Sequence, residues 1–208
     1  TRRGGLLYNF WQDAGRPRGL WRRTTLESYR TSDPAWEDLL DLDALAAAEG
    51  EDWVWQGARS LPGAHDRAIL SLSRGGGDAA VLREFDLPGR CFVEGGFAVP
   101  EAKGMVDWID RDTLLLSTAL GEGNATQSGY PRRIRLWRRG EAPLAAEVLF
   151  ETAPESMGLW GTVDRETGHL VFREQIGFYD ARYHLAKPGG AVRTLDLPTD
   201  MRLDWHHG

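Results

Sequence analysis

The sequence predicts an all-β fold, a partial β-propeller of about four four-stranded antiparallel blades. One unit of four strand-length apolar runs joined by turn residues lies in residues 105–150, and similar units lie before and after it. An Asp-Arg pair stands in the first turn of three units, at Asp66, Asp110 and Asp164. Repeats of roughly 40–50 residues with four strands each are typical of propeller blades.

The unit at residues 105–150 has the clearest pattern. Its apolar-rich runs cover residues 106–109, 113–119, 133–138 and 145–150. The short length of these runs and the turn residues between them favour strands over helices. The first and third links are short, whereas the second link, GEGNATQSGYP, is long. We therefore predict a four-stranded meander with one prominent loop.

The first 42 residues are predicted to form a blade that lacks its first strand. The expected strands are residues 6–10, 19–29 and 36–42, with a long loop over QDAGRPR. The segment DALAAAEG that follows predicts a short helix with Asp43 as N-cap and Gly50 as the C-terminal glycine.

The second blade is expected at residues 51–98 and the fourth at 157–198, with a fifth beginning at 201–208. Since both ends of the chain fall inside the repeating pattern, we expect a piece of a longer protein. An open ring of blades leaves unpaired strand edges, which favour self-association.

Composition narrows the function classes. The formal net charge of −6 argues against a nucleic-acid-binding surface. No apolar run approaches the ~20 residues of a membrane span. The single cysteine, Cys91, cannot form an internal disulfide, so we expect a cytoplasmic protein, with the periplasm left open. No sequence pattern indicates a cofactor or a metal site.

The long loops predict where binding takes place. In a four-stranded blade, the second link and the link to the next blade emerge on one side, so residues 100–104 and 121–131 should lie together on one rim. Long loops on a rigid scaffold often carry function, although such loops also simply cover sheet ends. No G-x-S-x-G nucleophile motif occurs. Glu101 and Glu122 leave a propeller glycosidase as a further hypothesis.

The runs YNFWQDAGRPRGLWRRTTLESYR, WEDLLDLDALAAAEGEDWVW and FAVPEAKGMVDWIDRDTLLLSTALGEG resemble the N-terminal propeller of the prolyl oligopeptidase family of serine peptidases. The resemblance covers essentially the whole chain. It implies a seven-bladed propeller, of which about four blades are present, and a C-terminal α/β-hydrolase domain that supplies the Ser, Asp and His of the triad. No catalytic residue of the family falls on this chain.

The resemblance implies a gating role, in which the propeller admits short peptides to a peptidase that cleaves typically after proline. The fragment alone is then expected to be inactive, with the hydrolase domain and short peptides as its partners. The residues expected to contact peptide or hydrolase domain are Glu101, Lys103, Asn124, Gln127 and Tyr130. A stand-alone propeller that binds a protein or a sugar without catalysis is the alternative.

Overall fold

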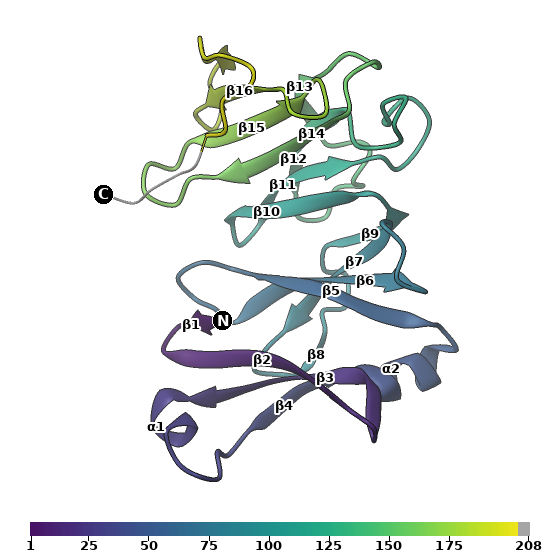
Figure 1. Cartoon of the computed structure of the whole chain (residues 1–208), viewed down its shortest axis with the longest axis vertical. Coiled ribbons are helices and arrows are strands. Elements are labelled where there is room, and N and C mark those ends of the chain that lie inside the picture. The colour runs from purple at the N-terminus through teal and green to yellow at the C-terminus, as the bar shows by residue number, and fades with distance from the viewer. Residues whose placement is uncertain (204–208) are drawn as a thin grey trace. The chain divides into compact units, whose positions relative to one another are not determined.

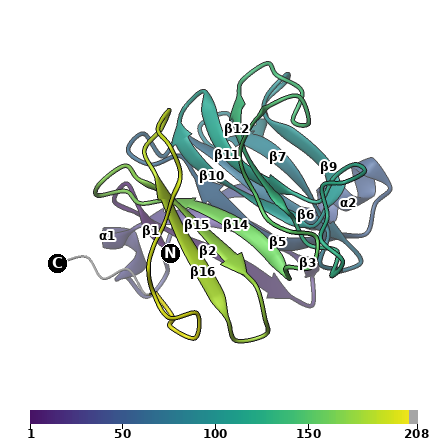
Figure 2. The same cartoon turned by 90° about the horizontal axis from the view of Figure 1, so that it is seen from above.

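The computed structural model describes residues 1–203, and its strands form four antiparallel sheets. The chain divides into two compact units, Thr1–Val99 and a second that begins at Pro100, and each is described by itself. Figures 1 and 2 label the elements within each unit. Within the described residues no helix is long and apolar enough to cross a membrane.

The first sheet has four strands in sequence order, so the prediction of a missing first strand was wrong. The strands are β1 (Arg2–Arg3), β2 (Leu6–Asp13), β3 (Arg16–Thr25) and β4 (Glu37–Asp41). Strand β1 pairs with β2, with Arg2 opposite Leu7. Two residues are too few to produce an alternating pattern, and for this reason the sequence did not reveal β1.

Two further expectations for this sheet were wrong. The segment QDAGRPR is not a long loop, because Asp13 pairs with Arg16 and only a two-residue turn remains. The Asp13 Oδ1 accepts hydrogen bonds from the backbone N–H groups of Gly15 and Arg16, both at 2.9 Å, which stabilises this turn. Strand β3 ends at Thr25, whose hydroxyl accepts from the Ser28 N–H at 3.0 Å and starts the short helix α1 (Leu26–Tyr29).

Helix α2 (Leu42–Glu49) forms where a helix was predicted, but with a different N-cap. The Asp41 Oδ1 caps the helix by accepting from the Ala44 N–H at 2.9 Å. Asp43 instead accepts from the Arg18 backbone N–H, at 3.1 Å to Oδ2, and so fastens α2 to β3. Gly50 ends the helix at φ +68°, as predicted.

The second sheet follows α2. It consists of β5 (Trp53–Ser60), β6 (Arg67–Arg74), β7 (Ala80–Asp86) and β8 (Cys91–Phe92), and β9 (Ala98–Ala102) also pairs with β7. The two sheets of the first unit enclose one core. Its buried members are Tyr8, Trp21, Leu39, Ala68, Leu70, Phe85 and Leu87. Leu42 and Ala46 of α2 add a second cluster against Trp53 and Leu72.

The second unit also contains two sheets. The first consists of β10 (Gly104–Asp110), β11 (Thr113–Thr118), β12 (Arg133–Arg138) and β13 (Glu147–Glu151). The other consists of β14 (Gly158–Val163), β15 (Leu170–Gln175), β16 (Ala181–Ala186) and β17 (Arg193–Thr194). Figure 2 shows β14, β15 and β16 side by side. Each sheet runs in sequence order, the meander expected of a blade.

An apolar core joins the two sheets of the second unit. Leu115 and Ile134 pack from β11 and β12 against Leu159, Leu170 and Phe172 of β14 and β15. A fifth blade was expected to begin at residues 201–208. Residues 201–203 have no strand, and the rest of that segment lies outside the described residues.

Candidate functional site

The candidate site in the second unit is built on the loop between β11 and β12, residues 119–132. The Ala119 N–H donates to the Lys103 carbonyl at 2.9 Å, which ties the start of the loop to the segment before β10. The loop then folds back on itself, since the Thr126 N–H donates to the Tyr130 carbonyl at 2.8 Å. The tip of the loop is bound to the segment between β13 and β14, because the Gln127 N–H donates to the Pro154 carbonyl at 2.8 Å. The loop is therefore held by the backbone of three chain segments.

Asn124 lies inside this loop, with 5% of its surface exposed. Its Nδ2 donates to the Leu120 carbonyl at 2.9 Å. Its Oδ1 accepts from Arg133 Nη1 at 3.1 Å and from Arg135 Nη2 at 3.0 Å. Burial removes water from the Arg135 guanidinium and lowers its pKa. The Asn124 Oδ1 replaces part of that lost hydration by accepting a hydrogen bond from the guanidinium. Through these hydrogen bonds Asn124 stabilises the conformation of the loop.

Replacing Asn124 with alanine is expected to lower the free energy of unfolding by about 2 kcal/mol, because the Leu120 carbonyl loses its side-chain donor and the Arg135 guanidinium loses an acceptor. Urea titration followed by circular dichroism measures the change. The exposed neighbour Gln127, changed to alanine, is the matched control, and its effect should stay within about 0.5 kcal/mol. Equal effects at the two positions would contradict this role for Asn124.

Lys103 and Tyr130, from the two segments predicted to share a rim, come together. The Lys103 ammonium lies 4.3 Å from the centroid of the Tyr130 ring, a cation–π contact. The Tyr130 ring lies 5.9 Å from that of Trp160 on β14. Gly158 makes this packing possible, because a Cβ there would lie 2.5 Å from the Trp160 ring and 3.0 Å from the Tyr130 Cβ. The result is a half-buried aromatic pair with a cation on one side.

The other two predicted residues lie near this group in sequence and are exposed. Glu101 is on β9, two residues before Lys103, and Gln127 is at the tip of the loop. Lys103 and Tyr130 are thus shown in contact, and Asn124 lies behind them within the same loop.

Sequence reasoning missed a buried polar cluster in the same unit. Glu174 and His184 pair across β15 and β16, with His184 Nε2 3.1 Å from Glu174 Oε2. The other ring nitrogen of His184 lies 2.9 Å from the Thr194 hydroxyl. The hydroxyls of Thr152 and Ser156 hydrogen bond to the same carboxylate. Both imidazole nitrogens are therefore hydrogen bonded within the protein, and His184 is only 3% exposed.

This cluster predicts a pH dependence of stability. Burial lowers the pKa of His184 below its ordinary 6.5, although the hydrogen bond to Glu174 opposes the shift. Below pH 6.5 the unfolded chain therefore binds a proton that the folded chain does not, so stability falls as the pH decreases through this range. Unfolding curves between neutral and mildly acidic pH should show a steeper loss for the natural chain than for His184→Gln. If the natural chain and His184→Gln lost the same stability over this pH range, His184 would not be the cause of the pH dependence.

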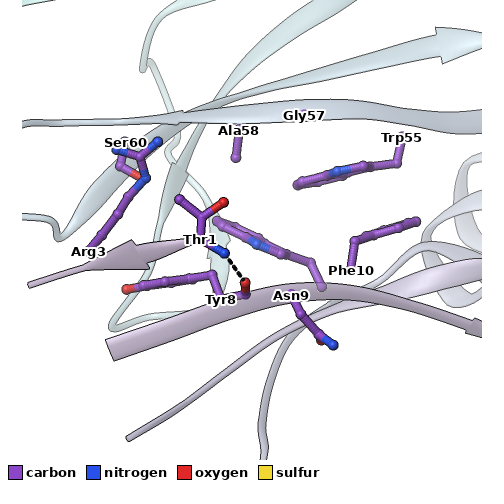
Figure 3. Close-up of a pocket in the computed structure, with 10 residues that line it drawn as sticks. Thr1, Arg3, Tyr8, Asn9, Phe10, Trp55, Gly57, Ala58 and Ser60 are labelled. Carbon is purple, nitrogen blue, oxygen red and sulfur yellow. Dashed lines mark hydrogen bonds between the residues drawn. The ribbon is translucent and has the colours of Figure 1, made fainter. Parts of the chain in front are cut away.

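The first unit contains a separate cavity of about 430 Å³ between its two sheets (Figure 3). Aromatic rings from β2, β3 and β5 form much of its wall, and Thr1 and Arg3 lie at its edge. The Thr1 amino group donates to the Tyr8 carbonyl at 2.8 Å. Within residues 1–203, no group of three His, Cys, Asp or Glu side chains is arranged to hold a metal ion.

Comparison with known proteins decides the family. The sequence profile described as the N-terminal β-propeller domain of prolyl oligopeptidase matches residues 1–186. The chain belongs to the prolyl oligopeptidase family. The match covers most of the chain, and with the four antiparallel sheets it confirms the predicted fold class, a partial propeller.

Similar proteins agree with this membership. The uncharacterized peptidase y4nA of Sinorhizobium fredii is 44% identical over 148 residues, covering 71% of this chain and 20% of that protein. The uncharacterized peptidase RP174 of Rickettsia prowazekii is 35% identical over 161 residues, covering 74% and 22%. A post-proline cleaving enzyme from Rickettsia typhi superposes with a TM-score of 0.89 at 29% identity, covering 96% of this chain and 31% of that one. The chain thus spans about a fifth of the length of the curated relatives that it matches.

Proposed function

We propose that this prolyl oligopeptidase family chain is the substrate-gating propeller portion of a serine peptidase that cleaves short peptides, typically after proline. The observation that carries the proposal is the match of the N-terminal propeller domain to residues 1–186. The post-proline cleaving activity of the Rickettsia typhi protein, to which this chain is similar over 96% of its length, supports the substrate class.

The proposed division of labour places the chemistry in a C-terminal hydrolase domain of the same protein. The chain has no G-x-S-x-G motif. The propeller would act by excluding folded polypeptides and by letting a flexible peptide reach the nucleophile. By itself the fragment would then be inactive.

We assign the four sheets to consecutive blades at residues 1–42, 51–98, 105–150 and 157–198. Strand edges at the ends of such an open series favour self-association of the isolated fragment. Light scattering over a concentration series tests this point. We propose a cytoplasmic location, with a periplasmic one as the alternative, because the single cysteine, Cys91, cannot form an internal disulfide.

We propose that the rim of the second unit touches the peptide or the hydrolase domain through Glu101, Lys103, Gln127 and Tyr130. Lys103 and Tyr130 already lie together, so they offer one cation and one aromatic face at a single place. Asn124 contributes by holding the loop that carries Gln127 and Tyr130.

A paired activity measurement tests the proposal. The purified 208-residue chain should not cleave a short fluorogenic peptide with proline before the scissile bond, whereas the longer protein encoded by the same gene should cleave it. The longer protein should also prefer a short peptide over a peptide of several tens of residues by about tenfold or more in kcat/KM. Cleavage by the 208-residue chain above a contaminant control would refute its inactivity. Equal rates for short and long peptides would refute gating.

A further inference from the structure

We propose that the cavity of the first unit binds a small planar aromatic carboxylate. The cavity lies between the sheet of β1–β4 and the sheet of β5–β8, within residues 1–60 (Figure 3). Its volume of about 430 Å³ falls in the range of small-molecule sites, roughly 300–1,000 Å³. The proposal stands independently of the gating function.

The hollow exists because β5 is irregular and carries small residues at this point. The pairing of β5 with β6 shifts register between Trp55 and Gly57, a β-bulge. Gly57 has φ +142°, and a Cβ built on it would meet nothing within 4 Å. Ala58 follows with only a methyl group, which points into the space (Figure 3). Larger side chains here would fill the gap between the sheets.

The walls of the cavity suit a flat ring. Phe10 and Trp55 stack almost parallel, with centroids 4.9 Å apart and an angle of 8° between the rings. Trp21 lies 5.3 Å from Trp55 and 6.0 Å from Tyr8, so the aromatic surface continues along the cavity. Aromatic pairs in such offset and tilted arrangements are favourable beyond the area that they bury. An aromatic ligand would extend this cluster.

The polar groups at the cavity select a negative charge. Arg3 reaches towards Ser60 at one side of the cavity (Figure 3). No Asp or Glu is among the described residues that line it. Within residues 1–203 no carboxylate forms an ion pair with Arg3, so its guanidinium is available to a ligand. Guanidinium binds carboxylate through two parallel N–H···O bonds, and the Ser60 hydroxyl can donate a third.

A cationic ligand is disfavoured at this place, although aromatic walls often bind cations. Arg3 would repel it, and the lining offers no carboxylate to compensate. Asn9 does not change this balance, since its side chain points away from the cavity and its Oδ1 accepts from Arg22 Nε at 2.9 Å. Charge and shape together therefore favour an aromatic acid over an aromatic amine.

The test uses the 208-residue chain with indole-3-carboxylate as the probe and the uncharged indole-3-carboxamide as its isostere. Isothermal titration and ligand-observed NMR should detect binding of the carboxylate, with the carboxamide about fivefold weaker, the loss expected for one partly exposed ion pair. Arg3→Gln should abolish this preference. Arg2→Gln, at the exposed neighbouring position, is the matched control and should preserve it.

A second variant tests the location independently. Ala58→Leu fills the cavity and should weaken binding of both probes by tenfold or more, and its thermal unfolding curve shows whether the unit remains folded. If Ala58→Leu fails to fold, the Arg3→Gln and Arg2→Gln pair still decides. Absence of binding to the natural chain would overturn the proposal. So would equal affinity for acid and amide, or unchanged binding in a folded Ala58→Leu chain.

Discussion

Replacing Asp107 with alanine is expected to lower the free energy of unfolding of the second unit by about 3 kcal/mol. Asp107 lies on β10 and is 2% exposed. Its Oδ2 accepts from the Val163 N–H on β14 at 2.9 Å, and its Oδ1 forms an ion pair with Arg165. One carboxylate therefore joins the two sheets of this unit, and its loss removes the acceptor of the Val163 N–H and the ion-pair partner of Arg165, which keeps its bond to the Trp108 carbonyl.

Urea unfolding followed by far-ultraviolet circular dichroism measures this effect. Asp196→Ala is the matched control, because Asp196 is exposed in the same unit and its loss should change stability by no more than about 0.5 kcal/mol. Asp107→Asn keeps an oxygen for Val163 and removes the charge, so it should lie between the natural chain and Asp107→Ala. A loss at Asp107 no larger than that at Asp196 would show that the apolar core alone holds the sheets together.

The strands of the third predicted blade were predicted correctly because their positions follow from the local pattern of apolar and turn residues. Expected runs at residues 106–109, 113–119 and 133–138 correspond to β10 (Gly104–Asp110), β11 (Thr113–Thr118) and β12 (Arg133–Arg138). Each is a short apolar-rich run bounded by turn residues, and each is buried against a neighbouring sheet.

Errors arose where one side-chain hydrogen bond decides the local structure. Asp13 converts QDAGRPR from a loop into a turn, and Thr25 ends β3 by capping α1. Asp41 and Asp43 are both acceptable N-caps in sequence, and only the packing of α2 on β3 selects Asp41. Sequence pattern predicts that a cap or turn is present more reliably than which residue forms it.

The candidate sites also differ in how far the sequence could predict them. Meander geometry predicted that the segments carrying Lys103 and Tyr130 lie together, because it brings the second link and the interblade link to one side, and the contact between the two side chains agrees with this. The pairing of Glu174 with His184 depends on burial across β15 and β16, and the aromatic cavity depends on the bulge at Gly57. Burial and register are set by tertiary packing, so neither feature had a local signal in the sequence.

Gly19→Ala is expected to lower the free energy of unfolding of the first unit by about 2–4 kcal/mol. Gly19 is a buried residue of β3 with φ +106°, a backbone conformation that residues with a Cβ rarely adopt. A Cβ there would also collide with the ring of Phe10. The ring would have to leave its stack on Trp55, which forms part of the wall of the aromatic cavity.

The two contributions can be separated. Gly63→Ala is the matched control, since Gly63 has φ +79° but an added Cβ would meet nothing within 4 Å, so only the backbone strain of about 1–2 kcal/mol applies. In a double-mutant cycle, Phe10→Ala should relieve part of the cost of Gly19→Ala, because the clashing ring is gone. Additive effects would mean that the backbone conformation of Gly19, rather than its contact with Phe10, determines the residue at this position. In that case Gly19→Ala would leave the Phe10–Trp55 stack, and with it the wall of the cavity, in place.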